Sequence, residues 1–184
     1  MRVFLNPGHA SCGCPDPGAV NSGTGLRECD VAKNIADLVE KYLTKVGVSV
    51  SGNLQSDDLF EVGSSSNNLD ADVFVSIHCN AFNGVAQGTE VWHYHTSKYG
   101  KQLAECIQRQ IVGAMGTVDR GVKGAEPGRN GLYVLTNTDA VSVLVETAFI
   151  DNAEDEVLLR TKQVEFARAI ARGITDFEQE TLNR

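Results

Sequence analysis

Short apolar runs alternate with amphipathic stretches along the chain, and this alternation predicts the fold class. Three runs are apolar almost throughout, as expected of strands that are buried on both faces of a sheet. They are Arg2–Leu5, Val73–Ile77 and Val141–Val145. Val48–Val50 predicts another strand, and so does Thr89–His95, where alternate side chains point to opposite faces.

The segments between these strands carry apolar residues at helical spacing. One helix is predicted from Val31 to Val46, with Gly47 as its stop, and two more follow around 103–111 and 167–177. Alternating strands and helices are typical of an α/β domain built on a largely parallel sheet. The sequence contains no repeat, linker or low-complexity block, so we expect residues 1–184 to form a single domain.

Composition and charge narrow the classes of function. The formal net charge is −8, which argues against a nucleic-acid-binding protein, because such proteins cluster Lys and Arg along phosphates. No apolar run approaches the roughly 20 residues that cross a bilayer. Met1–Leu5 leads directly into a glycine-containing turn, so no signal peptide is expected. The five cysteines are an odd number without zinc-ribbon spacing, which favours free thiols, with a redox or metal role for Cys12 and Cys14 left open.

Each fully apolar strand is followed by a side chain that can titrate or bind a metal. His9 follows the first strand, His78 the second and Glu146 the third. Ligands of open α/β sheets bind at the carboxyl edge of the strands. A single histidine at a strand end is more often structural, but three such residues aimed at one edge predict a site.

Two histidines do not complete a catalytic zinc site, which normally has three protein ligands and an open position. Glu28, at the start of the first predicted helix, is the natural third ligand. Taken alone, it is explained equally by the preference for acidic residues at helix N-termini. Beside His9 and His78 it completes a His₂Glu set that leaves one position for water, whose pKa falls from about 15.7 to near 7 on zinc.

Glu146 is the candidate catalytic carboxylate. Burial at the end of an apolar strand raises the pKa of a carboxyl, which suits a group that accepts and then returns a proton. The alternative is a buried carboxylate that is paired with Arg or Lys for structural reasons. A zinc site with a second carboxylate for proton transfer predicts metal-assisted hydrolysis of an amide.

The same residues carry a family resemblance over nearly the whole chain. The sequence resembles the zinc-dependent N-acetylmuramoyl-L-alanine amidases of the amidase-3 type in four segments that occur in the family's order. These are Pro7-Gly8-His9 with Asp16-Pro17-Gly18-Ala19, Leu26-Arg27-Glu28, Ser76-Ile77-His78-Cys79-Asn80, and Val143-Leu144-Val145-Glu146-Thr147. The Cys-rich turn Ala10–Pro15 departs from the family, which usually has a second Gly directly after the first His.

The resemblance implies that His9, Glu28 and His78 bind one zinc ion and that Glu146 is catalytic. It also implies a twisted, mixed sheet of about six strands with helices on both faces. The implied activity is hydrolysis of the amide between N-acetylmuramic acid and L-alanine in peptidoglycan. We therefore expect a monomeric enzyme that acts at the cell wall, as an autolysin, a phage endolysin or an excised catalytic domain. The alternatives are another zinc peptidase of the cell wall and a non-catalytic wall-binding module.

Weaker signals surround these residues. Asn80 either orients the site or caps a strand end, and Arg120 and Lys123 either meet stem-peptide carboxylates or belong to a solvated loop. His93 and His95 share one face of a strand and could chelate a metal, although a half-buried strand face explains them more simply.

Overall fold

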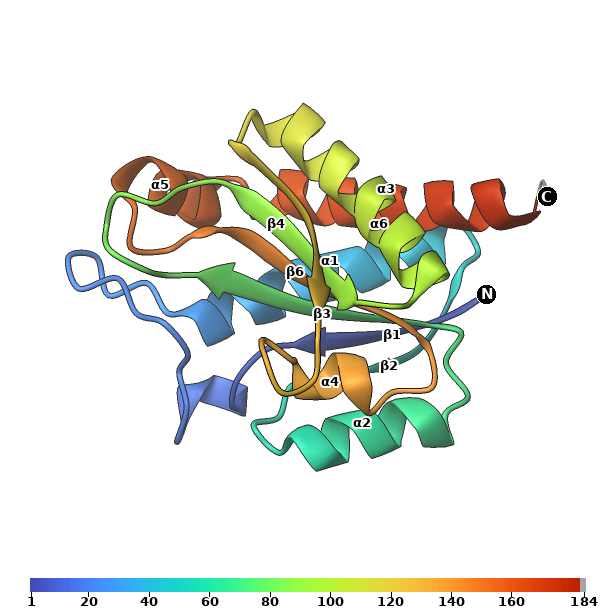
Figure 1. Cartoon of the computed structure of the whole chain (residues 1–184). Coiled ribbons are helices and arrows are strands. Elements are labelled where there is room, and N and C mark those ends of the chain that lie inside the picture. The colour runs from blue at the N-terminus through green and yellow to red at the C-terminus, as the bar shows by residue number, and fades with distance from the viewer. Residues whose placement is uncertain (183–184) are drawn as a thin grey trace.

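A computed structural model describes residues 1–182 of the chain, and a six-stranded sheet lies at its centre (Figure 1). The strands follow the spatial order β2-β1-β3-β6-β4-β5. Their bounds are β1 Arg2–Pro7, β2 Ser49–Asn53, β3 Val73–Asn80, β4 Thr89–Tyr94, β5 Asp119–Ala125 and β6 Val141–Phe149.

The sheet is mixed, with one antiparallel junction. Strands β2, β1, β3 and β6 are parallel to one another, whereas β4 runs antiparallel to β6 and β5 runs parallel to β4. The predicted α/β fold with a mostly parallel sheet of about six strands is therefore confirmed.

Three long helices cover one face of the sheet. These are α1 Glu28–Lys45, α3 Lys98–Met115 and α6 Gln163–Leu182, and they pack on the larger part of the hydrophobic core. Their apolar residues recur at helical spacing, and α1 alone buries Val31, Ile35, Val39 and Leu43. The short helix α5 Ala153–Thr161 packs beside β6 and α6. All three predicted helices lie on this face.

The opposite face has a smaller cover. Helices α2 Leu59–Asn68 and α4 Tyr133–Thr136 lie next to each other on this side (Figure 1), and a one-turn 3₁₀ helix, η1 Ser11–Gly13, follows β1. A second hydrophobic cluster forms here around Phe4, Phe74 and Leu144.

Strand β5 and helix α2 were not predicted from the sequence. Asp119–Ala125, which contains the predicted loop around Arg120 and Lys123, is the edge strand β5. The Ser64–Asn68 cluster forms the last part of α2, whose first turn is capped by the Asp58 side chain. Among residues 1–182, no helix combines the length and apolar character needed to span a membrane.

Candidate metal centre

The strand ends bring the predicted site residues to one edge of the sheet. His78 and Glu146 are partners in the register of the parallel pair β3 and β6, and Gly8 beside His9 donates its backbone N–H to the carbonyl of Ile77. Val75 and Val145 point to the face covered by α1, so strand alternation places His78 and Glu146 on the face that carries α2 and α4.

Glu28 joins the two histidines from the first turn of α1. Its Oε1 lies 3.0 Å from Nε2 of His9 and 2.9 Å from Nδ1 of His78. One ligand atom from each of the three residues lies within 4.8 Å of the others. Two imidazoles and one carboxylate form the donor set of many catalytic zinc sites. The residues present therefore fit a metal ion of that kind.

Several further contacts fix the orientation of these three side chains. Asp16 holds the other ring nitrogen of His9, with 2.7 Å between Oδ2 and Nδ1, and it accepts the N–H of Gly18 through Oδ1. The carboxylate of Glu28 accepts backbone N–H groups from Ala19 at 2.8 Å and Cys79 at 2.9 Å. Carboxylates that hold metal-binding histidines in this way set the tautomer and the ring orientation.

Two glycines allow the ligands to approach one another. A Cβ at Gly18, whose φ is +68°, would lie 2.6 Å from Oε2 of Glu28 and 2.7 Å from Nε2 of His9. A Cβ at Gly8 would overlap the imidazole ring of His78. The glycines of the first motif are thus required because backbone passes directly against the ligands.

The three charges strongly perturb one another. Burial by itself disfavours the charged form of His9, but Glu28 and Asp16 outweigh it and raise the pKa of His9 to about 9. Burial would likewise raise the pKa of Glu28, yet His78 and His9 outweigh it and hold that pKa well below its usual range. A metal ion takes neutral imidazole, so an ion bound here would have to displace the proton of His9.

Glu146 differs from Glu28 in having a carboxylate oxygen without a hydrogen-bond partner. Its Oε2 is shielded from solvent and has no hydrogen-bond partner among residues 1–182. Burial raises the pKa of Glu146 to about 7, and the negative charges of Glu28 and Glu90 act in the same direction, while His78 opposes them. A carboxyl that titrates near neutrality can both accept and donate a proton.

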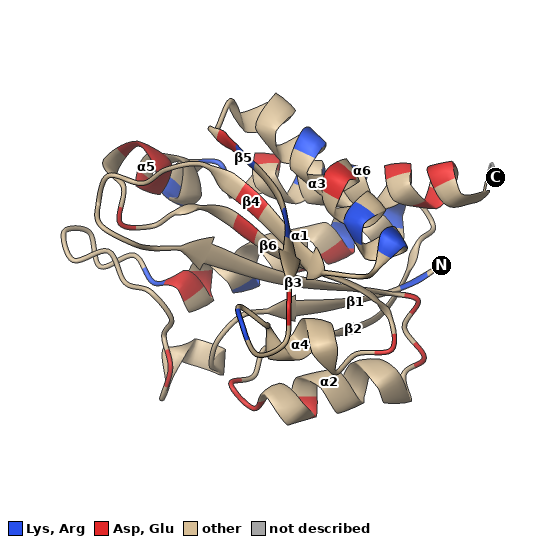
Figure 2. Cartoon of the chain, viewed as in Figure 1, with Lys and Arg blue, Asp and Glu red and all other residues tan. Residues whose placement is uncertain are grey.

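Glu90 is the centre of a second cluster of charged and polar side chains, and this cluster was not predicted from the sequence. It is directly opposite Glu146 on the antiparallel pair β4 and β6, and Figure 2 shows the acidic bands of these two strands side by side. Its Oε1 accepts hydrogen bonds from Asn80 at 3.2 Å and Trp92 at 3.1 Å. Its Oε2 lies 2.7 Å from Nε of Arg120 and 2.8 Å from Nζ of Lys123.

The three predicted substrate contacts therefore all meet at Glu90. The signal that could have indicated this residue was the alternation within Thr89–His95, which places a carboxylate on the same face as Trp92. That pattern does not predict which cations contact Glu90, because Arg120 and Lys123 lie on another strand. Asp16 was missed as well, although it belongs to a motif that was recognised.

The other metal-capable residues lie outside this centre. His93 donates through Nδ1 to the carbonyl of Tyr94 at 2.8 Å, and His95 donates through Nδ1 to the carbonyl of Ala125 at 3.3 Å, so each ring has a partner of its own. All five cysteines are free. Cys12 and Cys14 are exposed in the turn after His9, whereas the other three are buried.

Two cavities adjoin the site. The first, of about 270 Å³, is lined by both histidines of the cluster, Asp16, Asp57, Leu59 and Tyr133 among others. The second, of about 310 Å³, is lined by Asn80, Glu90, Trp92, Asn130, Leu132 and Glu146. Leu132 lines both cavities, so the two cavities lie next to each other.

Sequence comparison finds relatives across this whole region. Residues 3–176 match the family described as N-acetylmuramoyl-L-alanine amidase, Amidase_3. The amidase LytC of Bacillus subtilis (strain 168) is 36% identical over 180 residues, which are 95% of this chain and 34% of that protein. The endolysin of Bacillus phage SPP1 is 34% identical over 192 residues, which are 98% of this chain and 66% of that protein. The chain thus spans about a third of the length of LytC.

Solved structures of similar proteins share the fold. An N-acetylmuramoyl-L-alanine amidase from Clostridium difficile 630 superposes with a TM-score of 0.85 at 28% identity, covering 97% of this chain and 96% of that one. The amidase AmiC2 of Nostoc punctiforme gives a TM-score of 0.85 at 32% identity, covering 97% of each chain. The extent of these matches shows that the chain belongs to the N-acetylmuramoyl-L-alanine amidase family Amidase_3.

Proposed function

We propose that this chain hydrolyses the amide bond between the lactyl group of N-acetylmuramic acid and the L-alanine of the stem peptide in peptidoglycan. Membership of the amidase family supports the choice of bond. The observation that carries the proposal is the convergence of His9, Glu28 and His78 beside Glu146, a carboxylate with one buried oxygen that has no hydrogen-bond partner among residues 1–182. A wall-binding module would have no need of that second carboxylate.

One zinc ion is the proposed cofactor. His9 would hold it through Nε2, Glu28 through its carboxylate and His78 through Nδ1, the atoms that converge in the structure. When bound, the ion supplies a Lewis acid that polarises the amide carbonyl and brings the pKa of the attacking water from about 15.7 towards 7. Asp16 keeps Nε2 of His9 directed at the site by holding Nδ1.

Glu146 carries the proton in this proposal. Its carboxylate accepts a proton from the attacking water while the oxygen–carbon bond forms, and it then donates that proton to the alanine nitrogen as the carbon–nitrogen bond breaks. The products are a lactyl carboxylate and a free amino group on alanine. Because both cavities are built from the residues of this chain, we propose that residues 1–184 act as one catalytic domain and as a monomer at the cell wall.

Purified peptidoglycan and metal analysis test the proposal together. We expect about one zinc ion per chain, release of new L-alanine amino groups, and a Glu146→Gln variant that keeps zinc but releases almost none. Cleavage within the stem peptide would instead identify another wall peptidase. Absence of zinc together with full activity of Glu146→Gln would disprove the catalytic assignment.

A further inference from the structure

The two neighbouring cavities, one at His9 and one at Glu146, differ in their chemistry, and this difference indicates how the substrate is oriented. We propose that the cavity at Glu146 takes the stem peptide, with Arg120 and Lys123 binding the α-carboxylate of the residue that follows the alanine. The cavity at His9 then takes the lactyl and sugar side. This inference rests on the proposed amidase function and adds to it the orientation of the substrate and the chemical group that is recognised.

The position of Glu146 gives the first argument. The cavity of about 310 Å³ is lined by Glu146 and by neither histidine of the metal centre. The cavity of about 270 Å³ is lined by His9 and His78 and not by Glu146. The group that returns the proton must reach the alanine nitrogen, which stays with the peptide product. The peptide half of the substrate therefore lies on the Glu146 side.

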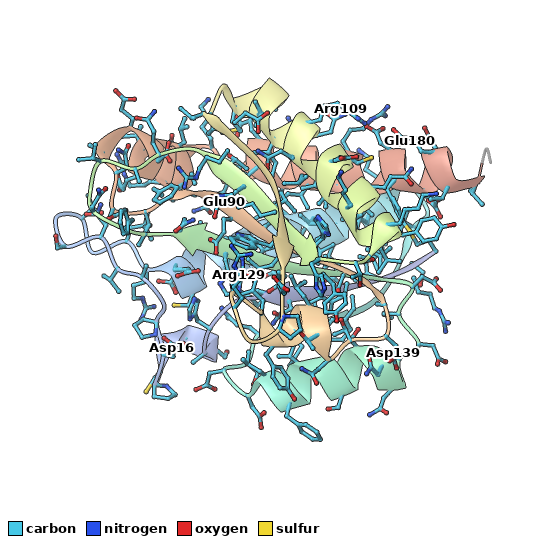
Figure 3. All side chains as sticks on the ribbon, in the orientation of Figure 1. Asp16, Glu90, Arg109, Arg129, Asp139 and Glu180 are labelled. Atoms are coloured by element: carbon cyan, nitrogen blue, oxygen red, sulfur yellow. The ribbon has the colours of Figure 1, made fainter. Side chains whose placement is uncertain are left out.

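The distribution of charge gives a second and independent argument. The Glu146 cavity is lined by two carboxylates, Glu90 and Glu146, and Arg120 and Lys123 lie 2.7 and 2.8 Å from Oε2 of Glu90, so cations balance the acidic groups on this side. The His9 cavity is also lined by two carboxylates, Asp16 and Asp57, but no Lys or Arg is among its lining residues. Figure 3 shows Asp16 near η1, away from Glu90 on β4. Side chains that can form a charge-assisted hydrogen bond with a peptide carboxylate are thus found beside the Glu146 cavity.

Both cations retain the capacity to bind a ligand. The side chains of Arg120 and Lys123 are 32% and 33% exposed, respectively. The hydrogen bond from Arg120 to Glu90 uses Nε, so the two Nη groups of its guanidinium stay available for a planar carboxylate. Both residues contact Glu90 from β5, at the margin of the cavity. Alanine at the reacting bond would occupy the cavity, and the next residue would reach this margin.

Glu90 acts here as a positioning residue. It is 4% exposed, and it fixes four side-chain donors, those of Asn80, Trp92, Arg120 and Lys123. The Arg120 guanidinium also lies 4.8 Å from the ring centroid of Phe149, and Nζ of Lys123 lies 5.7 Å from that of Trp92. Flexible cations lose conformational entropy when a ligand orders them. Because Glu90 already holds Arg120 and Lys123 in place, these side chains lose less conformational entropy when a ligand binds.

Two small substrates that differ in one charge test the proposal. N-acetylmuramyl-L-alanyl-D-glutamate carries a free α-carboxylate on its second residue, and its α-amide does not. We expect KM of the zinc-loaded parent enzyme to be about tenfold lower for the free acid, as one charge-assisted contact allows, with little change in kcat. Arg120→Gln and Lys123→Gln should each remove most of this preference.

Matched variants separate this site from general charge effects. Lys101→Gln removes the same charge from α3 on the opposite face, where Lys101 pairs with Glu105, and the preference should remain. Loss of the preference in Lys101→Gln as well would overturn the proposal. Asp57→Asn alters the cavity at His9. If that variant changes the preference for the free acid and Arg120→Gln does not, the stem peptide lies in the His9 cavity and the proposed orientation is wrong.

A measurement on the unmodified enzyme covers the case in which a variant folds poorly. Because exposed charges are screened by salt, the preference for the free acid should shrink as ionic strength rises. A parent enzyme that cleaves both compounds with equal KM refutes this inference and leaves the amidase function standing. Cleavage of neither compound, together with intact peptidoglycan, would refute the proposed function and this inference with it.

Discussion

Two buried glutamates, Glu28 and Glu90, lie in the same site under nearly the same conditions. Each is 4% exposed, and each accepts contacts from several donors on different elements. The pKa of both carboxyls is lowered: burial acts against the shift in each case, and the donors outweigh it. What separates them is the chemistry of their partners.

Glu28 is surrounded by histidines and Glu90 by Lys and Arg. Imidazoles can lose a proton and bind a metal ion, so the partners of Glu28 can be converted from cations into ligands. A guanidinium stays protonated at all accessible pH values, and an ammonium group beside a carboxylate favours its charged form. Equal burial therefore gives a proposed metal ligand in one cluster and a carboxylate that holds two cations in place in the other.

The largest expected effect separates these two roles directly. Glu28→Gln removes a metal ligand, so we expect loss of stoichiometric zinc and a fall of amidase activity to background, because water without the ion keeps a pKa near 15.7. Glu90→Gln, the matched control at equal burial, should still bind about one zinc per chain. Metal content after gel filtration, together with amine release from peptidoglycan, measures both. Loss of zinc in Glu90→Gln would show that the two clusters are not separate.

Glu146 belongs to neither cluster, and its substitution should affect the rate without affecting the metal. Glu146→Gln removes the proton carrier, so we expect kcat to fall by about 10²- to 10⁴-fold with zinc content unchanged. Steady-state kinetics and metal analysis on the same preparation test this. A kcat within tenfold of the parent would assign the proton transfer to another group.

Burial of Glu146 also predicts a pH-dependent effect on stability in the metal-free protein. The pKa rises from 4.5 to about 7 on folding, so the stabilising contribution is present below pH 4.5 and is lost as the pH rises through 7. Glu146→Gln, which mimics the protonated form, should therefore be more stable than the parent at pH 8, by up to about 3 kcal/mol, and similar to it at pH 4. Urea unfolding of both proteins at the two pH values tests the sign. Equal stability at pH 8 would contradict it.

The sequence predicted the metal cluster because physical rules connect each ligand to a recognisable pattern. His9 and His78 follow strands that are apolar throughout, and parallel strands end at one edge. Glu28 is weaker in isolation, because acidic residues are common at helix starts. The prediction for Glu28 depends on His9 and His78, because the three side chains together make up the donor set of a catalytic zinc site.

The Glu90 cluster could not be predicted in the same way. Arg120 and Lys123 lie on β5, an edge strand with the sequence DRGVKGA. This sequence has no alternation of apolar and polar residues that would predict a strand. Helix α2 escaped notice because its glycine, serines and asparagines have low helix propensity, and its stability comes from packing and the Asp58 cap. Contacts that depend on which strands pair are visible only in the folded chain.

A smaller effect concerns the residue that supports the metal ligand from outside. Asp16→Asn weakens the contact to Nδ1 of His9 but can keep the acceptor for the N–H of Gly18. We expect zinc affinity to fall by about 10- to 100-fold, the usual cost of losing such a contact. Competition with a zinc chelator measures it. Asp139→Asn, which lies away from η1 in Figure 3, is the control and should bind zinc like the parent.

The smallest expected effect links the two clusters through Glu146. Glu90 is directly opposite Glu146 across the β4 and β6 pair, and its charge is one of the causes of the raised pKa of that carboxyl. Glu90→Gln removes the charge, so the pKa of Glu146 should fall, by the equivalent of roughly 0.5 kcal/mol for a screened pair of like charges. Carboxyl-carbon NMR titration of metal-free protein measures the change, with Glu146→Gln to assign the signal. Glu61→Gln, which removes a charge from exposed α2, should leave the titration unchanged. An unchanged or higher midpoint in Glu90→Gln would mean that the charge of Glu90 does not raise the pKa of Glu146 and that Glu90 acts only on the cations beside it.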